Sequence, residues 1–343
     1  MKYLYKSFYG NEVSKIRNNG VIFKAKDFML NEHWELATPP LANYGMPGSA
    51  IIISGNPAYF KQLADNGKNS DGFGIIYDYQ GGVKAYFDQI AKPLIDIKIA
   101  SMGLNPATFV GTLSIDIEVA YPATNEELSS WNHGFTNFAI YMKNYHQIEK
   151  ENAIKIYNGL CAQYYPHLIN YLRQKFPKAK IGWYDFPFQG PHHHTWYANS
   201  AKIPAIIDNT ENNLAWLLGM LDYISPSCYM YYDLEDNWNA PGRTSYDDYR
   251  NARTLYFQYS ADLKAKTGLL CLPTVCPVYI EFAGAKAGKP VENEEWSIVN
   301  EMLTLCQADG AIIWANARTV EDATNISAGL LAGSKTLNEF RMR

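Results

Sequence analysis

The feature that most constrains the fold of this chain is an alternation of short apolar runs with longer helical patterns, from about residue 49 to residue 320. Most of the apolar runs are continuous, which is typical of strands that are buried on both faces. Such strands separated by helices indicate a parallel sheet covered by helices. The candidate strands are residues 50–54, 74–78, 110–118, 180–186, 223–231, 269–275 and 310–315.

Helical patterns occupy the segments between these strands, and the longest of them predicts two helices that break near Asn158-Gly159. Seven or eight strand–helix units fit a closed barrel better than a doubly wound sheet, and no Gly-x-Gly-x-x-Gly follows a candidate strand. The predicted fold class is therefore α/β, a single TIM-like (β/α) barrel of seven or eight strands, regular or distorted. The helical candidates are residues 88–100, 132–176, 213–221, 245–267 and 292–307.

The length of 343 residues fits one barrel domain, which typically takes ~250 residues plus insertions. We expect residues 1–343 to form a single catalytic domain. Within it, 1–48 would be an irregular start with room for the first strand, 49–320 the barrel core, and 321–343 a C-terminal helix. The apolar content of 47% is enough for a sizeable core.

Composition and charge argue against several partners. The net charge is -4 and no basic run occurs, so nucleic acid is a poor candidate. The first ten residues, MKYLYKSFYG, predict no signal peptide, and no run approaches the ~20 apolar residues of a membrane span. The five cysteines are odd in number and scattered, which predicts small apolar packing residues rather than a disulfide framework or a zinc site.

The strongest chemical signal is the run Ser114-Ile115-Asp116-Ile117-Glu118. Residues two apart point to the same face of a strand, so Asp116 and Glu118 share a face at a carboxyl strand end, where barrel enzymes build their sites. Two carboxylates about 6–7 Å apart repel each other, and repulsion with partial burial raises one pKa. A raised pKa suits a proton donor to a glycosidic oxygen. The alternative is a pair of strand-end acids that cap a helix or pair with surface lysines.

Acids and aromatic residues recur at other strand ends. Trp183 and Asp185 are predicted on one face of a strand and Tyr184 on the other, while Tyr229 and Trp314 follow two further strands. One such residue is usually part of the core, but several together are typical of a sugar site. The aromatic share of 14%, with 26 Tyr and 8 Trp, fits either a core or a sugar-binding groove.

Over roughly residues 73–320, five motifs resemble the hyaluronidase family of glycoside hydrolases and keep the family's order along the chain. One motif corresponds to the strand that carries the family's Asp-x-Glu pair, and a second to a segment upstream of that strand. Two more correspond to strands that supply tyrosines of the site, and the fifth to the tryptophan that forms a wall of the pocket. The motifs are Phe109-x-Gly111-x-x-x-Ile115-Asp116-x-Glu118, Ile75-Ile76-Tyr77-Asp78, Gly182-x-Tyr184-x-Phe186-Pro187, Pro226-Ser227-x-Tyr229 and Ile313-Trp314.

This resemblance implies a hyaluronidase-like endo-β-N-acetylhexosaminidase with a retaining, substrate-assisted mechanism. The N-acetyl oxygen of the substrate would attack the anomeric carbon, Glu118 would act as acid and base, and Asp116 would hold the acetamide. Tyr229 would bind the acetamide carbonyl beside Tyr184, and Trp314 would pack on the methyl group. Trp183 and Asp185 are added as candidate substrate contacts. The partner would be an oligosaccharide or polysaccharide, with no metal or organic cofactor, and the protein would be secreted or extracellular if the family's substrate class holds.

The chain departs from the family pattern in ways that bear on the substrate more than on the chemistry. Ile117 replaces the tryptophan that the family commonly has between its acids, and 119–122 (Val-Ala-Tyr-Pro) stands where Trp-Arg-Pro is usual. The cysteine pairs of the animal enzymes are not matched. Chitinase-like barrels are the next nearest family, with the same mechanism, but the gap between Gly111 and Asp116 favours the hyaluronidase side.

Two interpretations remain open beside the enzyme. A carbohydrate-binding or recognition protein on the same barrel would not cut its ligand, and the presence of Glu118 favours the enzyme because barrels that become lectins generally lose the acid. The run His192-His193-His194 invites a metal interpretation, but neighbouring histidines point apart. A solvated loop is expected there, with a substrate contact as the second choice.

Overall fold

The structure is a computed structural model of the 343-residue chain. It describes two strands near the N-terminus, most of the chain from Gly72 to Ile313, and three short helical pieces beyond. The described residues are 28–32, 49–53, 72–101, 105–116, 121–188, 200–229, 245–279, 287–313, 324–326, 328–329 and 332–333.

The strands form one sheet in which every pair is parallel, in the order β6-β5-β4-β3-β2-β1-β8-β7. The first strand lies within the predicted irregular start. The strands are β1 (Phe28–Glu32), β2 (Ser49–Ile53), β3 (Thr112–Ile115), β4 (Lys180–Tyr184), β5 (Tyr223–Ser225), β6 (Leu270–Cys271), β7 (Thr274–Val275) and β8 (Ala311–Ile313).

The sheet closes on itself because β6 and β7 are two pieces of one segment, interrupted at Leu272-Pro273. β6 pairs with β5 and β7 pairs with β8, so the two ends of the strand order meet. The contact with β5 continues past the interruption, where the backbone N–H of Cys228 donates to the carbonyl of Thr274 at 2.8 Å. The described strands therefore make a closed parallel barrel of seven positions. This confirms the predicted α/β barrel of seven or eight strands.

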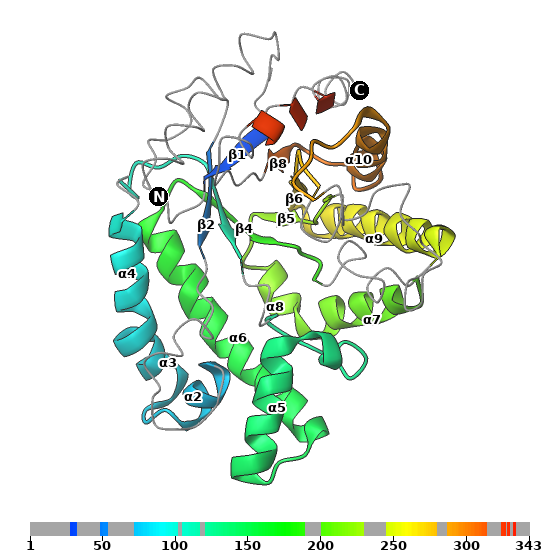
Figure 1. Ribbon diagram of the computed structural model, residues 1–343. Helices are drawn as coiled ribbons and strands as arrows, with labels where there is room; N and C mark the ends of the chain where they lie inside the picture. The colour runs from blue at the N-terminus through cyan, green and yellow to red at the C-terminus, as the bar shows by residue number, and fades with distance from the viewer. Residues whose placement is uncertain are drawn as a thin grey trace.

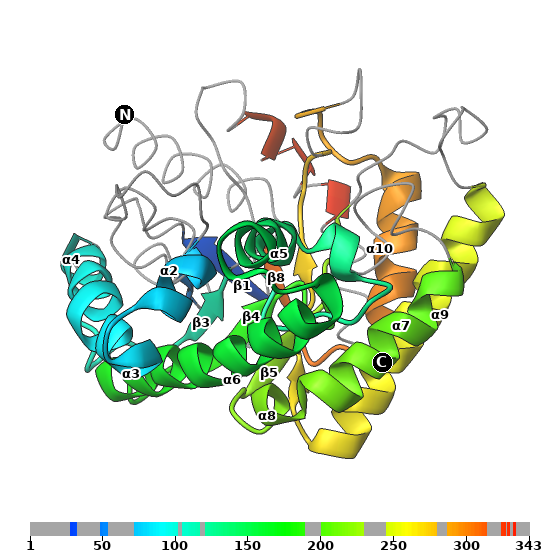
Figure 2. The ribbon, with the colours of Figure 1, turned by 90° about the horizontal axis from the view of Figure 1, so that it is seen from below.

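Helices surround the strands on the sides shown in Figure 1 and Figure 2. They follow the strands in sequence, as the predicted alternation requires. Among the described helices, none combines the length and the apolar character that crossing a bilayer takes. The helices are α2 (Gly72–Asp78), α3 (Gly82–Tyr86), α4 (Lys92–Ser101), α5 (His133–His146), α6 (Lys150–Lys175), α7 (Ile203–Asp208), α8 (Ala215–Leu218), α9 (Tyr246–Thr267) and α10 (Asn293–Leu305).

Local sequence explains the bounds of α9 well. The hydroxyl of Ser245 caps the helix by accepting from the backbone N–H of Asp248, and acids occupy the first turn, where they oppose the helix dipole. Lys264 and Lys266 lie in the last turn, and Gly268 ends the helix with a left-handed φ of 74°. These signals made residues 245–267 predictable from the sequence.

The barrel has two apolar cores, one on each face of its wall. The large outer core lies between strands and helices and includes Leu113 and Ile115 of β3. The small inner core joins Tyr223, Leu272 and Ile312 from three different strand segments. A filled interior is what a small barrel requires, since its inward side chains meet at the axis.

One predicted strand is wrong, because residues 74–78 lie in helix α2. The buried residues of this segment are Phe73 and Ile76, three apart, which is a helical spacing. The ring of Phe73 packs on that of Tyr157 in α6, with centroids 4.9 Å apart. A five-residue apolar run fits either a strand or a short buried helix, and packing against α6 decided between them.

The predicted helix break is also misplaced. The chain breaks between α5 and α6, at Gln147, which has a left-handed φ of 59°. Asn158 and Gly159 lie inside α6. The Asn158 side chain exchanges two hydrogen bonds with the backbone of Thr124, at 3.0 and 2.9 Å, so this residue serves tertiary packing and does not end the helix.

The inner face of β4 gives a stability prediction. A Cβ added at Gly182 would lie 2.3 Å from the ring of Tyr223, whose hydroxyl donates to the carbonyl of Leu113 at 2.9 Å. We expect Gly182→Ala to destabilise the fold by about 1–3 kcal/mol, because overpacking a barrel interior displaces a buried ring. Gly159→Ala is the control, since its Cβ would meet nothing within 4 Å and a helical alanine should stabilise by about 0.5–1 kcal/mol. Urea unfolding of both variants checks the difference, and equal stabilities would contradict it.

Candidate active site

The parallel register places several candidate residues at one edge of the barrel. Ile115 of β3 pairs with Trp183 of β4, and Tyr184 pairs with Ser225 of β5. Asp116 follows β3 directly, so it leaves the sheet at the level where β4 ends with Tyr184. Because all strands run in one direction, these residues lie at the carboxyl end of the barrel, where barrel enzymes carry their sites.

The alternation along β3 determines which way Asp116 leaves the strand. Leu113 and Ile115 belong to the outer core, whereas the buried Thr112 and Ser114 contact the Tyr223 hydroxyl inside the barrel. Burial raises the pKa of Tyr223, and its hydrogen bonds to Ser114 and Thr112 act in the opposite direction. Asp116 continues the inward set of Thr112 and Ser114. Its side chain is partly buried, and its Oδ1 atom is buried.

The two predicted site tyrosines lie together. The rings of Tyr184 and Tyr229 are 5.7 Å apart and tilted by 32°. The hydroxyl of Tyr184 lies 3.4 Å from the hydroxyl of Ser227 on the segment after β5. Each tyrosine keeps only a small exposed fraction, 7% for Tyr184 and 6% for Tyr229. Two phenols from neighbouring strand ends therefore form one hydrogen-bonding wall beside the exit of β3.

Trp183 lies on the other side of β4. It is fully buried, and its ring packs edge-on against Tyr165 of α6 and against Phe188, with centroids 5.0 and 5.6 Å apart. In this position the indole fills the outer core between β4 and α6. We therefore do not include Trp183 among the proposed substrate contacts.

Asp185 follows the last residue of β4 and is 2% exposed. Its backbone has a left-handed φ of 59°, so strand alternation ends here. Its Oδ2 accepts from the hydroxyl of Tyr121 at 3.4 Å. Burial raises the pKa of Tyr256 well above its usual value, and the negative charge of Asp185 adds to this effect. Asp185 therefore interacts with the buried protein groups Tyr121 and Tyr256.

Glu118 and Trp314 lie outside the described residues, as does the run from His192 to His194. Their predicted roles stay predictions.

The sequence analysis did not predict two features of the site. Hydroxyl groups line the inside of the barrel at β5 and β7, where Ser225 and Thr274 share a 2.7 Å hydrogen bond. Serines two apart, at Ser225 and Ser227, were a detectable signal, since this spacing places both on one strand face. Tyr121 had no such signal, because its partner Asp185 is 64 residues away.

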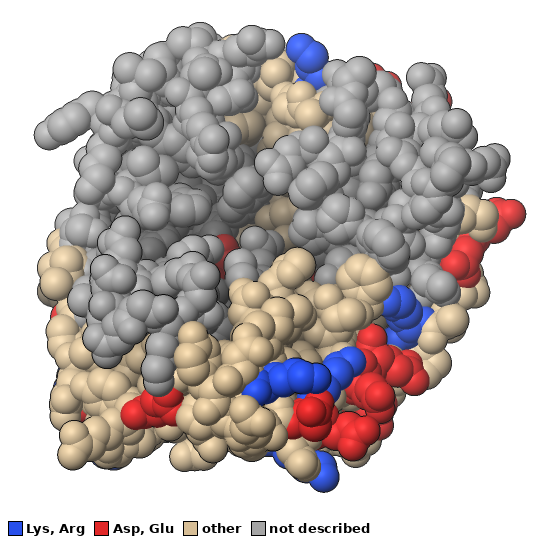
Figure 3. Space-filling view, turned by 60° about the horizontal axis from the view of Figure 1, so that its bottom comes forward, with Lys and Arg blue, Asp and Glu red and all other residues tan. Residues whose placement is uncertain are grey.

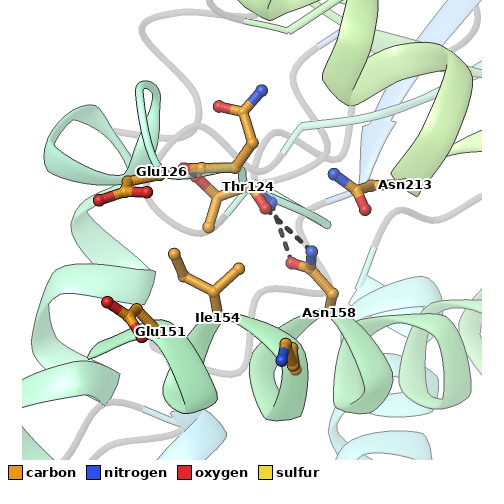
Figure 4. A pocket seen from close by; sticks show the side chains of 8 residues that line it. Thr124, Glu126, Glu151, Ile154, Asn158 and Asn213 are labelled. Atoms are coloured by element: carbon orange, nitrogen blue, oxygen red, sulfur yellow. Dashed lines mark hydrogen bonds between the residues drawn. The ribbon is translucent and has the colours of Figure 1, made fainter. Parts of the chain in front are cut away.

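A separate pocket of about 470 Å³ lies between the segment after β3 and the first turns of α6, as Figure 4 shows. Its lining mixes amides, acids and an apolar floor at Ile154. It contains no residue of the predicted site. Its lining residues are Thr124, Asn125, Glu126, Glu151, Ile154, Lys155, Asn158 and Asn213.

The described parts of the chain offer little support for metal-dependent or thiol-dependent chemistry. There, no group of three or more His, Cys, Asp or Glu residues is arranged to hold a metal ion. All five cysteines are buried free thiols, which confirms their predicted packing role. Burial raises the pKa values of Cys228 and Cys271 well above that of a free thiol, which makes them poor nucleophiles. Among the described residues on the face drawn in Figure 3, most of the charged side chains gather toward the lower right, where acidic and basic groups lie side by side.

Comparisons with known proteins bear on the fold. A scan against protein-family models and a search among curated proteins each found no match. Among solved structures, the chain is similar to the monoclinic crystal form of bee venom hyaluronidase, with a TM-score of 0.56 and 13% identity over 91% of this chain and 97% of that one.

Two further structures are similar. The structure of bee venom hyaluronidase in complex with a hyaluronic acid tetramer gives a TM-score of 0.51 and 15% identity, over 75% of this chain and 74% of that chain. The catalytic domain of an endo-beta-1,4-mannanase from Bacillus sp. JAMB-750 gives 0.46 and 12%, over 88% and 67%. At these identities the comparison establishes the fold, and this chain has the parallel β/α-barrel fold that is found in bee venom hyaluronidase.

Proposed function

We propose that this protein is a glycoside hydrolase that cleaves a glycan containing N-acetylhexosamine, in the manner of a hyaluronidase-like endo-β-N-acetylhexosaminidase. The observation that carries the proposal is the placement of Asp116. It directly follows β3 at the level of Tyr184, whose ring lies beside that of Tyr229, and strand alternation directs its side chain inward. A barrel with the fold of bee venom hyaluronidase surrounds these residues.

The reaction would proceed in two steps with retention of configuration. In the first, the acetamide oxygen of the substrate attacks the anomeric carbon while Glu118 gives its proton to the departing glycosidic oxygen. In the second, the Glu118 carboxylate takes a proton from water, and the water oxygen opens the cyclic intermediate at the anomeric carbon. Glu118 is protonated again at the end, so the cycle closes.

The remaining residues would serve the acetamide group. Asp116 accepts from the acetamide N–H and stabilises the positive charge that develops on this nitrogen. The phenol of Tyr229 donates to the acetamide oxygen, Tyr184 lines the same wall, and Trp314 covers the methyl group. A tethered nucleophile reacts at a high effective concentration. The partial burial of Asp116 strengthens its charge interaction, because the effective dielectric constant is lower than in water.

The decisive experiment is a substrate screen of the purified chain. It would include hyaluronan, chondroitin, chitin oligomers and peptidoglycan fragments, with mannan and cellulose as glycans that lack N-acetyl groups. The proposal expects new reducing ends only from glycans with N-acetylhexosamine. Binding without cleavage would identify a carbohydrate-recognition protein instead, and cleavage of mannan or cellulose alone would contradict the mechanism.

We further expect a chelator to leave cleavage unchanged, because carboxylates and the substrate's own acetamide supply the proposed chemistry. The measurement is the turnover of any substrate found in the screen, with and without prolonged treatment with EDTA. A parallel sample treated with EDTA and then dialysed against buffer controls for effects of the treatment itself. Activity that disappears with EDTA and returns with one added metal would contradict this prediction.

A further inference from the structure

Tyr121 follows the proposed proton donor, Glu118, by three residues in the chain. Three residues span at most about 10 Å of extended chain, so whatever holds Tyr121 limits where Glu118 can lie. We infer that Tyr121 and Asp185 form a latch that ties the chain, three residues after Glu118, to the end of β4. The effect of this latch on catalysis rests on the proposed function.

One end of the latch is the backbone of Tyr121. Its carbonyl accepts two hydrogen bonds, from the hydroxyl of Tyr157 on α6 at 2.9 Å and from the side-chain amide of Asn132 at 3.1 Å. Asn132 is also the N-cap of α5, where it accepts from the backbone N–H of Phe135. Both donors are fully buried. The carbonyl of Tyr121 is thereby tied to two helices at once.

The other end of the latch is the side chain of Tyr121. Its hydroxyl donates to Oδ2 of Asp185 at 3.4 Å, and its ring lies 5.3 Å from the ring of Phe188. Tyr121 is 6% exposed and Asp185 is 2% exposed. Asp185 directly follows Tyr184, so the latch connects the segment after Glu118 to the strand end that supplies a proposed substrate contact.

The geometry points to positioning rather than to direct chemistry. A separation of 3.4 Å is longer than the ~2.5–3.0 Å of an ordinary O–H···O hydrogen bond, so this contact orients the two side chains more than it contributes bond energy. A carboxylate that is almost fully buried strongly prefers a hydrogen-bonded environment, which makes the pairing with Tyr121 directional. Asp185, predicted from the sequence as a substrate contact, is thus assigned to holding the site together.

Tyr121→Phe tests the latch, because it removes the hydroxyl and keeps the ring packing. The matched control is Tyr171→Phe. Tyr171 is also nearly buried, at 7%, and also donates to a carboxylate, that of Asp96, but it joins α6 to α4 away from the strand ends. Hydrogen exchange of backbone amides should rise several-fold in peptides covering 117–121 and 185–188 in Tyr121→Phe, and should stay at the parent rate there in Tyr171→Phe.

Kinetics provide a second measurement on a cleaved substrate. Tyr121→Phe should lower kcat by about 10- to 100-fold with little change in KM, because misplacing a catalytic group by ~1 Å can cost that much. Asp185→Asn keeps an acceptor oxygen and should retain more activity than Asp185→Ala. The double variant Tyr121→Phe/Asp185→Ala should be no slower than the worse single one.

The two proposals can fail separately. If the parent cleaves no glycan, the proposed function fails, while the exchange comparison still decides the latch. Equal exchange at 117–121 in Tyr121→Phe and Tyr171→Phe would overturn the latch, whatever the activity. An equal loss of kcat in both variants would also overturn the latch, because it would show a general effect on stability.

Discussion

Glu118→Gln is expected to lower turnover by about 10²–10⁴-fold while the protein folds normally and still binds glycan. Glutamine has nearly the shape of glutamate, but its amide can neither give a proton to the leaving oxygen nor take one from water. Both steps of the proposed cycle therefore lose their proton transfer. Because the substrate's contacts with the other residues remain, affinity should change far less than rate.

The measurement pairs turnover with thermal melting and glycan binding on the same preparations. Glu151→Gln is a suitable control, since Glu151 is exposed in the first turn of α6 and is not part of the candidate site. It should melt and turn over like the parent. Undiminished turnover of Glu118→Gln on any substrate that the parent cleaves would remove Glu118 from its proposed role.

Asp116→Asn is expected to reduce turnover by about 10²-fold or more, the usual effect of removing one group that stabilises transition-state charge. The positive charge on the acetamide nitrogen would lose its carboxylate partner in a partly buried position, where a charge interaction counts most. The proposal adds a selective signature. Substrates without an N-acetyl group should be poor for the parent, and this substitution should make them little worse.

Comparing the two substrate types separates chemistry from folding. Asp262→Asn, on the exposed side of α9, serves as the control and should leave both rates unchanged. If Asp116 is only a structural acid, its substitution will shift the melting temperature and leave the cleavage of N-acetylated glycan intact. That outcome would argue against Asp116 as the acetamide partner.

The barrel class could be predicted from the sequence because its signal is local and repeated. Continuous apolar strands indicated burial on both faces, and caps and charges bounded α9. The inward direction expected for Asp116 rests on strand alternation, which needs only the neighbouring residues Ser114 and Ile115. The tyrosines at 184 and 229 were expected at one barrel edge, since parallel strands share their carboxyl ends.

Tertiary contacts decided the remaining features. Residues 74–78 form a helix because Phe73 packs on Tyr157, a partner that no local pattern reveals. Trp183 lies in the outer core because its ring packs against Tyr165 of α6. The ring closed through a strand that is split at Leu272-Pro273, with β5 on one side and β8 on the other.

The pairing of Tyr121 with Asp185 was also decided by tertiary contacts. The two residues are 64 positions apart, and only the parallel packing of β3 against β4 brings their following segments together. Hydrophobic periodicity and turn residues indicate only how a residue interacts with its neighbours in sequence. The sequence by itself thus determined the barrel, while packing between distant segments determined which buried groups lie together at the strand ends.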